Sequence, residues 1–323
     1  MRCLPSQPCH PRTKTSKARQ SNTCTTRHWK SDNKLVRKSR VTVVVDSSCC
    51  LPHNLQKDSG LVVVPHQLIV NGRAYRDGID IQADEFYRMQ KIQTTTTTTS
   101  GPTVKDFLDV FQKACADGKD VLCLTLPFRL SSATHEAACI AMRAVKDKFT
   151  NQRIQIIDSQ ASGGAEGLIA LETARNARAG ATLEELIHVV NNLIPKVHLL
   201  AFLETLQYLK RSGRITKVKA WAGSIFQIKP LAEFRLGNAK LISKPRSRAK
   251  AIEQLFSIAQ DRIGARPVHV NVMHANALKD ATELYHKVKL TLDCREIFVS
   301  EFTPVMGSHT GPGVLGLAFY QTD

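Results

Sequence analysis

No stretch of this 323-residue sequence contains the roughly 18–20 consecutive apolar residues that a membrane-spanning helix requires. The first forty residues also lack the short apolar segment of a secretory signal. The sequence therefore predicts neither an integral membrane protein nor a secretory leader.

Motifs of several enzyme classes are missing as well. We find no nucleophile elbow, no metal-ligand spacing and no carboxylate pair with an adjacent base. Gly311-x-Gly313-x-x-Gly316 matches the dinucleotide-binding fingerprint as a string, but the seven residues that follow cannot form the required helix, strand and distal acid. Ser162-Gly163-Gly164 lacks the spaced third glycine and the lysine of a phosphate loop. We expect no cofactor and no metal.

The nine cysteines are odd in number and scattered. Cys49 and Cys50 are adjacent, which suits neither an ordinary disulfide nor a metal site. Buried thiols in a reducing compartment explain the pattern better than a redox or zinc centre, so we expect a cytoplasmic protein.

Acidic residues are nearly absent from residues 1–40. This segment holds eleven Lys and Arg against the single Asp32, so it carries +10 of the net charge of +17. It also lacks apolar periodicity, which predicts a disordered extension or a start codon assigned too far upstream. An organelle transit peptide remains an alternative. Because the other 283 residues carry only +7, we expect no specific nucleic-acid binding by the body of the protein.

From Val41 to Pro195, apolar strand-like runs alternate with helical patterns, which is typical of βαβ units and a mainly parallel sheet. The predicted strands are 41–45, 61–65 continued by 67–70, 121–124 and 154–157. The predicted helices are 84–92, 104–116, 132–146, 164–179 and 182–194. The threonine-rich segment 94–100 is predicted to be an extended loop. We assign residues 41–195 to a first α/β domain.

After Pro195 the pattern changes to a mixture of hairpin and α/β signals, which predicts a second α/β domain over 196–323. Gly237-Asn238 is predicted to be the turn of a hairpin. The remaining predicted elements are strands at 199–203, 268–273, 296–300 and 316–320, a short helix near 206–209, and helices near 248–262 and 277–289.

Three loops of the first domain are rich in hydroxyl groups. Ligands of open α/β sheets bind at the carboxyl ends of the strands, and free backbone N–H groups at a helix start favour an anion. The sequence therefore predicts a site for a small anion, most simply a carboxylate. The three loops are Asp46-Ser47-Ser48, Thr99-Ser100-Gly101-Pro102-Thr103 and Ser131-Ser132-Ala133-Thr134.

The second domain adds two polar segments. Gly307-Ser308-His309-Thr310-Gly311-Pro312-Gly313 is predicted to be a glycine-rich loop that approaches a ligand closely, with His309 able to donate to a carboxylate. Lys210-Arg211-Ser212-Gly213-Arg214 is either a solvated basic turn or a charged part of the site.

A series of short motifs, in one order from about Val41 to Tyr320, resembles the DegV family of fatty-acid-binding proteins. No single motif is specific, but their order across the whole body is. The motifs are Val45-Asp46-Ser47-Ser48, Tyr75-Arg76-Asp77-Gly78-Ile79-Asp80, Thr99-Ser100-Gly101-Pro102-Thr103, Leu130-Ser131, Asp158-Ser159, Tyr208-Leu209-Lys210-Arg211-Ser212-Gly213-Arg214-Ile215, Ile228-Lys229-Pro230 and His309-Thr310-Gly311-Pro312-Gly313.

The resemblance implies a two-domain α/β fold with a mainly parallel sheet in the first domain and a mixed sheet in the second. It also implies a long-chain fatty acid in an apolar tunnel of the first domain, with the second domain closing over the headgroup. Thr99 and Ser131 would hold the carboxylate and His309 would support them.

The neighbouring Ser100, Ser132 and Thr310 are further candidate ligand contacts, and Arg211 and Arg214 would act electrostatically on the headgroup or a partner. The implied partner is a separate fatty acid kinase that makes acyl phosphate. Membrane contact would be transient, and the protein itself would not be an enzyme.

The sequence departs from the family pattern at Gly101, at Ser132-Ala133-Thr134 and at Ser212. Two other hypotheses remain: an autonomous hydrolase or phosphotransferase that uses Ser131 and His309, and a nucleic-acid or membrane-surface binder that acts through the basic tail.

Overall fold

The computed structural model describes residues 39–90, 96–213 and 228–322. Residues 1–38 of the predicted basic extension 1–40, and Arg214, therefore lie outside the described residues. Within the described part, no helix has the length and apolar character needed to cross a membrane.

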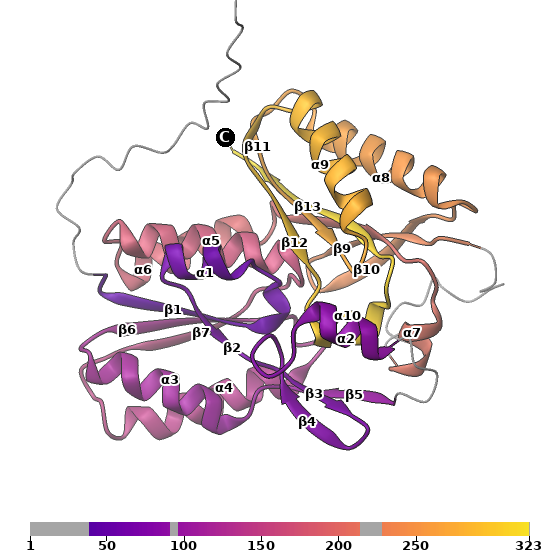
Figure 1. The fold of residues 1–323 in the computed structure, drawn as a ribbon. Coiled ribbons are helices and arrows are strands. Elements are labelled where there is room, and N and C mark those ends of the chain that lie inside the picture. Colours follow the sequence, from indigo (N-terminus) through magenta and orange to yellow (C-terminus); the bar gives the residue numbers. More distant parts are fainter. Residues whose placement is uncertain (1–38, 91–95, 214–227, 323) are drawn as a thin grey trace, which may run out of the picture. The chain divides into compact units, whose positions relative to one another are not determined.

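The first layer is a four-stranded parallel sheet with helices on both faces (Figure 1). The apolar runs of the sequence form its strands because both faces are covered, which favours continuous β-branched segments. In spatial order the strands are β2 (Val62–Val64), β1 (Val41–Asp46), β6 (Asp120–Thr125) and β7 (Ile154–Asp158). The sheet confirms the predicted parallel α/β layer.

Helices cover both faces of this sheet, and the sequence predicted all of them except the helix at 53–59. One face carries α3 (Val104–Ala116) and α4 (Ser132–Lys146), and the other carries α1 (His53–Ser59), α5 (Gly164–Arg178) and α6 (Leu183–Leu193). Thr103 and Thr182 each begin a helix with a capping box, because the hydroxyl and a carboxylate three residues on satisfy free N–H groups.

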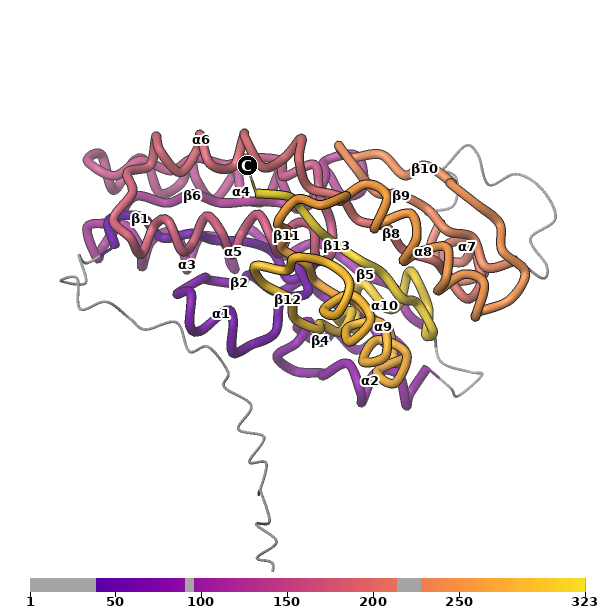
Figure 2. Tube along the Cα trace, turned by 90° about the horizontal axis from the view of Figure 1, so that it is seen from above, coloured from indigo at the N-terminus to yellow at the C-terminus, as the bar shows by residue number. Residues whose placement is uncertain are grey.

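The second layer is a six-stranded mixed sheet (Figure 2), in which β11 and β12 are parallel and the other pairs antiparallel. Helices α8 (Arg248–Ile263) and α9 (Leu278–Thr291) pack on it. In spatial order its strands are β10 (Asn238–Ser243), β9 (Leu231–Arg235), β8 (His198–Phe202), β13 (Leu315–Gln321), β11 (Val268–His274) and β12 (Cys294–Glu301). The mixed sheet expected after residue 195 is confirmed.

The predicted turn of the β9–β10 hairpin is displaced by one residue. Leu236 and Gly237, both with positive φ, connect the strands, and Asn238 already belongs to β10. Two consecutive positive φ values suit the two-residue hairpin turn that follows the twist of the strands.

Helix α5 connects the two layers, since it contacts β1 of the parallel sheet and β11 and β13 of the mixed sheet. Eleven of its fifteen residues are buried, and most of these are small or apolar. A helix that is covered on several sides does not need one apolar and one polar face. Helix α3, by contrast, has a distinct apolar face. The domain boundary predicted near Pro195 falls between α6 and β8 and stays a prediction.

A small antiparallel sheet corrects two predictions. It is formed by β4 (Arg73–Arg76), β3 (Gln67–Val70) and β5 (Thr97–Ser100). The segment 67–70 thus leaves the parallel sheet instead of continuing β2, and the described part of the threonine run is a strand rather than a loop. The sequence of β5 is polar and has no alternating apolar pattern that would predict a strand. Pairing with β3 supplies its backbone hydrogen bonds.

Three short helices complete the described fold. They are α2 (Ala83–Gln90), α7 (Gln207–Arg211) and α10 (Pro304–Thr310), with a single 3₁₀ turn at Ser47–Cys49. Helix α10 contacts β3, β5, α2 and α7, and it therefore lies beside the small sheet (Figure 1).

Candidate functional site

A cavity of about 630 Å³ lies where loops from the carboxyl edge of the parallel sheet meet β8, β9, β10 and α10. Its lining combines a long apolar surface with polar groups. The larger apolar side chains are Leu126, Leu130, Leu199, Leu203, Leu209, Phe234, Phe302, Val305, Met306 and Val314. Most of these lie after residue 195, so the cavity is built by both predicted domains together.

The polar lining includes Thr99, Ser131 and His309, which lie far apart in the sequence. The Oγ1 atom of Thr99 lies 2.9 Å from Nε2 of His309. Strand β5 fixes Thr99 because its register pairs Thr99 with the buried Leu68 of β3. Ser131 stands at the N-cap position of α4, and its hydroxyl lies 3.2 Å from Oγ1 of Thr134.

The segment around His309 is a helix, which corrects the predicted glycine-rich loop. Helix α10 contains Gly307, Ser308, His309 and Thr310, and only the residues from Gly311 onward form a loop. Pro304 starts the helix, where its missing N–H costs nothing. His309 thus projects from a helical backbone rather than from a flexible turn.

Two glycines permit close packing around α10. A Cβ atom on Gly307 would lie 2.3 Å from the hydroxyl oxygen of Tyr87, and one on Gly311 would lie 2.2 Å from ring carbon Cδ2 of Tyr208. Gly311 also has a φ of +78°, which side chains rarely adopt. The two glycines therefore allow α2 and α7 to pack closely against the helix that carries His309.

The other predicted site residues divide into two groups. Ser100 and Thr310 line the cavity together with Thr99, Ser131 and His309. Ser132, in the first turn of α4, does not line it. Arg211 is exposed on α7, with its guanidinium 5.9 Å from the ring centre of Tyr208, and it is outside the cavity wall.

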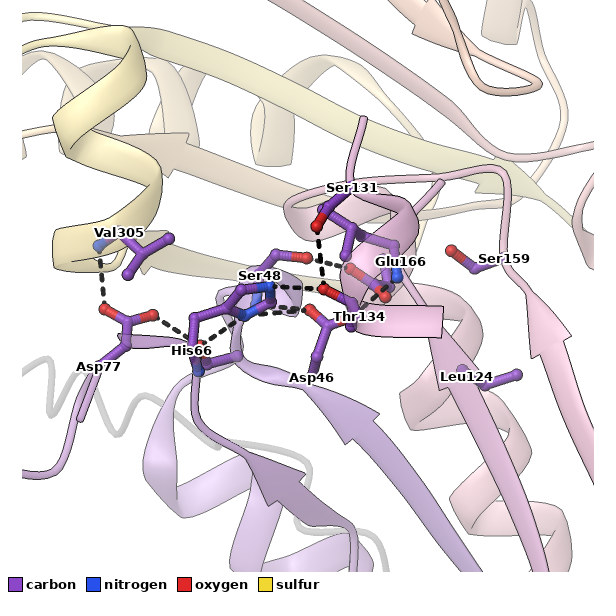
Figure 3. A network of polar contacts seen from close by, with 12 residues as sticks. Asp46, Ser48, His66, Asp77, Leu124, Ser131, Thr134, Ser159, Glu166 and Val305 are labelled. Carbon is purple, nitrogen blue, oxygen red and sulfur yellow. Dashed lines mark hydrogen bonds and ion pairs between the residues drawn. The ribbon is translucent and has the colours of Figure 1, made fainter. Parts of the chain in front are cut away.

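Behind the polar lining is a buried network that the sequence only partly indicated (Figure 3). The hydroxyl of Ser48 donates to Oε2 of Glu166 at 2.6 Å, and the backbone N–H of Ser48 donates to Oδ1 of Asp46 at 3.0 Å. Burial, reinforced by the negative charge of Asp46, raises the pKa of Glu166 well above its ordinary value, which favours the neutral carboxyl.

His66 lies at the centre of the network and also lines the cavity. Its Nδ1 atom lies 3.3 Å from the hydroxyl of Ser47 and 3.6 Å from Oδ1 of Asp46, and its Nε2 atom lies 3.3 Å from Oγ1 of Thr134. Sequence reasoning missed His66. The available signal was a histidine directly after Val64-Pro65, at the end of a buried strand.

Asp77 joins this network to α10. One oxygen accepts a hydrogen bond from the hydroxyl of Ser47 at 2.6 Å, and the other accepts from the backbone N–H of Val305 at 2.9 Å. Burial raises the pKa of Asp77, although these hydrogen bonds oppose the shift. The same carboxyl thus touches both the His66 network and the start of the helix that carries His309.

None of the six cysteines in the described part of the chain lines the cavity. Burial raises the thiol pKa values of Cys49 and Cys50, which keeps both thiols neutral and unreactive. In the part of the chain that the structure describes, no three His, Cys, Asp or Glu side chains are grouped so as to hold a metal ion.

The structure thus combines two α/β layers with an apolar cavity between them, and hydroxyls and a histidine lie on the polar wall of that cavity. The family model described as "Uncharacterised protein, DegV family" matches residues 40–322, and the chain belongs to this family. A DegV domain-containing protein from Streptomyces coelicolor is 31% identical over 280 residues, which cover 86% of this chain and 97% of the relative.

Solved structures agree with this assignment. A fatty-acid-binding DegV family protein from Thermus thermophilus superimposes with a TM-score of 0.80 at 27% identity, over 88% of this chain and all of that one. A stearic-acid-binding protein from Eubacterium ventriosum gives a TM-score of 0.80 at 26% identity, over 87% of this chain and 98% of that one. The resemblance predicted from the motifs is confirmed, and so is the fold.

Proposed function

We propose that this protein binds a long-chain fatty acid in the cavity, with the acyl chain along the apolar wall and the carboxylate at Thr99, Ser131 and His309. The observation that carries the proposal is the convergence of these three polar side chains on one cavity whose remaining wall is mainly apolar. That combination matches a ligand with one charged end and a long apolar body.

The size of the cavity supports a long chain. At about 30 Å³ for each water-sized group, a cavity of this volume holds on the order of 20 heavy atoms, which is the size of stearate. Each buried methylene contributes about 0.8 kcal/mol, so the acyl chain supplies most of the binding free energy. In this proposal the chain lies between the two segments that meet at residue 195, not within the first segment alone.

The carboxylate must recover the hydration that it loses on burial. Hydrogen bonds to a charged group contribute about 1.5–3 kcal/mol each, so two or three donors are enough to offset this cost. Thr99 and His309 form one pair of polar groups, and Ser131 is a third polar group. Ser100 and Thr310 also line the cavity.

We further propose that the protein is a carrier rather than an autonomous hydrolase or phosphotransferase, and that it presents the carboxylate to a separate fatty acid kinase for acyl-phosphate formation. Hydroxyl and imidazole donors hold a carboxylate by modest individual bonds. Phosphoryl transfer then requires only that the partner supply the nucleotide and position it in line with a carboxylate oxygen.

The test is binding of oleate to the delipidated chain and to Thr99→Ala/Ser131→Ala. Loss of both donors should raise Kd at least tenfold, because one lost hydrogen bond to a charged group already costs about 1.5–3 kcal/mol. Thr98→Ala is the matched control, since Thr98 lies on the same strand with its side chain exposed. An unchanged Kd in the double variant would refute the site.

Mass spectrometry of the denatured protein provides an independent readout, and a co-purifying fatty acid is expected. A protein that is repeatedly free of lipid and also fails to bind oleate or palmitate would refute the function. Steady turnover of acyl esters or nucleotides by the isolated chain would instead support the hydrolase or phosphotransferase alternative.

A further inference from the structure

A continuous chain of hydrogen bonds runs from Ser131 at the cavity wall to the buried Asp77 (Figure 3). Ser131 contacts Thr134 at 3.2 Å, Thr134 contacts Nε2 of His66 at 3.3 Å, and Nδ1 of His66 contacts Ser47 at 3.3 Å. Ser47 contacts Asp77 at 2.6 Å. Ser47, His66, Asp77 and Thr134 are all buried.

The direction of each bond follows from the number of hydrogens available. Ser47 has one hydroxyl hydrogen and donates it to the carboxylate of Asp77. The oxygen of Ser47 also accepts from the backbone N–H of His66 at 3.1 Å. It therefore accepts from the imidazole as well, and a neutral His66 carries its hydrogen on Nδ1.

In this state Nε2 of His66 is an acceptor, and Thr134 must donate its only hydrogen to it. Ser131 then donates to Thr134 and turns its lone pairs toward the cavity. We call the series of contacts from Asp77 through Ser47, His66 and Thr134 to Ser131 the relay. A carboxylate can only accept hydrogen bonds, so the neutral relay, in which Ser131 offers lone pairs to the cavity, does not suit the anion.

We propose that the buried Asp77–Ser47–His66 group takes up one proton when a carboxylate enters the cavity, because that proton reverses the relay and makes Ser131 a donor to the ligand. With a hydrogen on Nε2, His66 donates to Thr134, Thr134 donates to Ser131, and Ser131 donates into the cavity. The proton also balances the negative charge that the ligand brings. This inference rests on the proposed function and assigns His66 and Asp77 as positioning residues for it.

Two carboxyl groups lie close to the imidazole of His66. Asp46, at the end of β1, lies 3.6 Å from Nδ1, and Asp77 approaches through Ser47. Burial and the nearby Asp46 both raise the pKa of Glu166 on α5. His309 of α10 contacts Thr99, and Arg129 and Arg235 also line the cavity. The carboxyl of Asp77 and the imidazole of His66 are joined through Ser47, so the added proton is shared along these hydrogen bonds.

The relay implies a ligand preference. An ionised carboxylate requires the reversed relay, whereas a long-chain alcohol can donate its own hydrogen to Ser131 and bind the neutral relay. Carboxylate binding should therefore depend on pH and alcohol binding should not. Above the pH at which the free protein loses this proton, Kd for oleate should rise by up to tenfold per pH unit.

The experiment is calorimetric titration of the full chain with oleate and with oleyl alcohol at pH 8, in two buffers of different ionisation enthalpy. The wild type should take up one proton per oleate bound and none per alcohol. His66→Gln should abolish the uptake, because its amide N–H is a permanent donor to Thr134 and cannot titrate. His188→Gln, at an exposed site on α6, is the matched control and should keep the uptake.

A second pair of variants keeps the test decisive if His66→Gln does not fold. Thr134→Val breaks the relay and should also abolish the uptake, whereas Thr134→Ser keeps the hydroxyl and should retain it. Oleate binding by the wild type without proton uptake, or uptake that persists in both His66→Gln and Thr134→Val, would overturn the inference alone. Failure of the wild type to bind oleate at all would overturn the proposed function and this inference with it.

Discussion

Replacement of Gly311 by alanine tests whether the position of α10 depends on close contact with α7. The new Cβ would lie 2.2 Å from Cδ2 and 2.8 Å from Cγ of Tyr208. Because Cγ is near the root of the side chain, rotation of the ring cannot remove the overlap. Overpacking of this kind costs about 1–3 kcal/mol, and the positive φ adds about 1–3 kcal/mol of backbone strain.

Gly311→Ala should therefore lower the free energy of unfolding by about 2–6 kcal/mol, measured by urea denaturation. Two matched variants separate the contributions. Gly118→Ala also has a positive φ but no atom within 4 Å of the new Cβ, so it reports backbone strain alone. Tyr208→Ala/Gly311→Ala removes the overlap and should recover only the packing part of the loss.

The same substitution should weaken oleate binding, because His309 lies in the last turn of α10, two residues before the Gly311 that ends the helix. Stability equal to that of the wild type would show that α7 and α10 are not in the close contact described. If the double variant loses as much free energy of unfolding as the two single variants added together, the overlap is not the cause of the loss in Gly311→Ala.

Two further predictions follow from the buried carboxyl and from the exposed arginine. Burial raises the pKa of Glu166 above its ordinary 4.5, so the folded state binds a proton that the unfolded state releases, and stability is lost as pH rises from about 4.5 toward the folded-state pKa. Glu166→Gln should remove this loss, so its stability relative to the wild type should increase over that pH range in urea denaturation; a constant difference would contradict a raised pKa. Arg211 is exposed outside the cavity, so Arg211→Ala should lower acyl-phosphate formation with a fatty acid kinase but leave Kd for oleate unchanged. Arg246→Ala, also exposed, is the control, and equal rates for the two variants would refute a role of Arg211 in the partner contact.

Much of the fold was predictable because its signals are local. The predicted helix 132–146 coincides with α4, and the capping box at Thr182 correctly marks the start of α6. Each of these signals depends on residues within a few positions of one another, where helical periodicity and caps operate. The order of βαβ units then restricts the sheet to a mainly parallel arrangement.

The errors fall where long-range contacts override local preference. The threonine-rich strand β5 exists because β3 pairs with it, and α10 forms from a glycine-containing segment because α2 and α7 pack against it. Neither segment has the apolar spacing that would predict its structure alone.

For the site, the sequence by itself determined the chemical groups: hydroxyls after the strands, a histidine near the C-terminus, and enough apolar surface to bury a chain. Only the tertiary structure decided which of them meet. Thr99 and His309 are 210 positions apart, and Asp77 and Val305 are 228 apart. Contacts over such separations leave no periodic trace in the sequence, because they depend on how finished elements pack. The relay through His66 belongs to this second kind of information, since a lone histidine gains its role only from the buried groups around it.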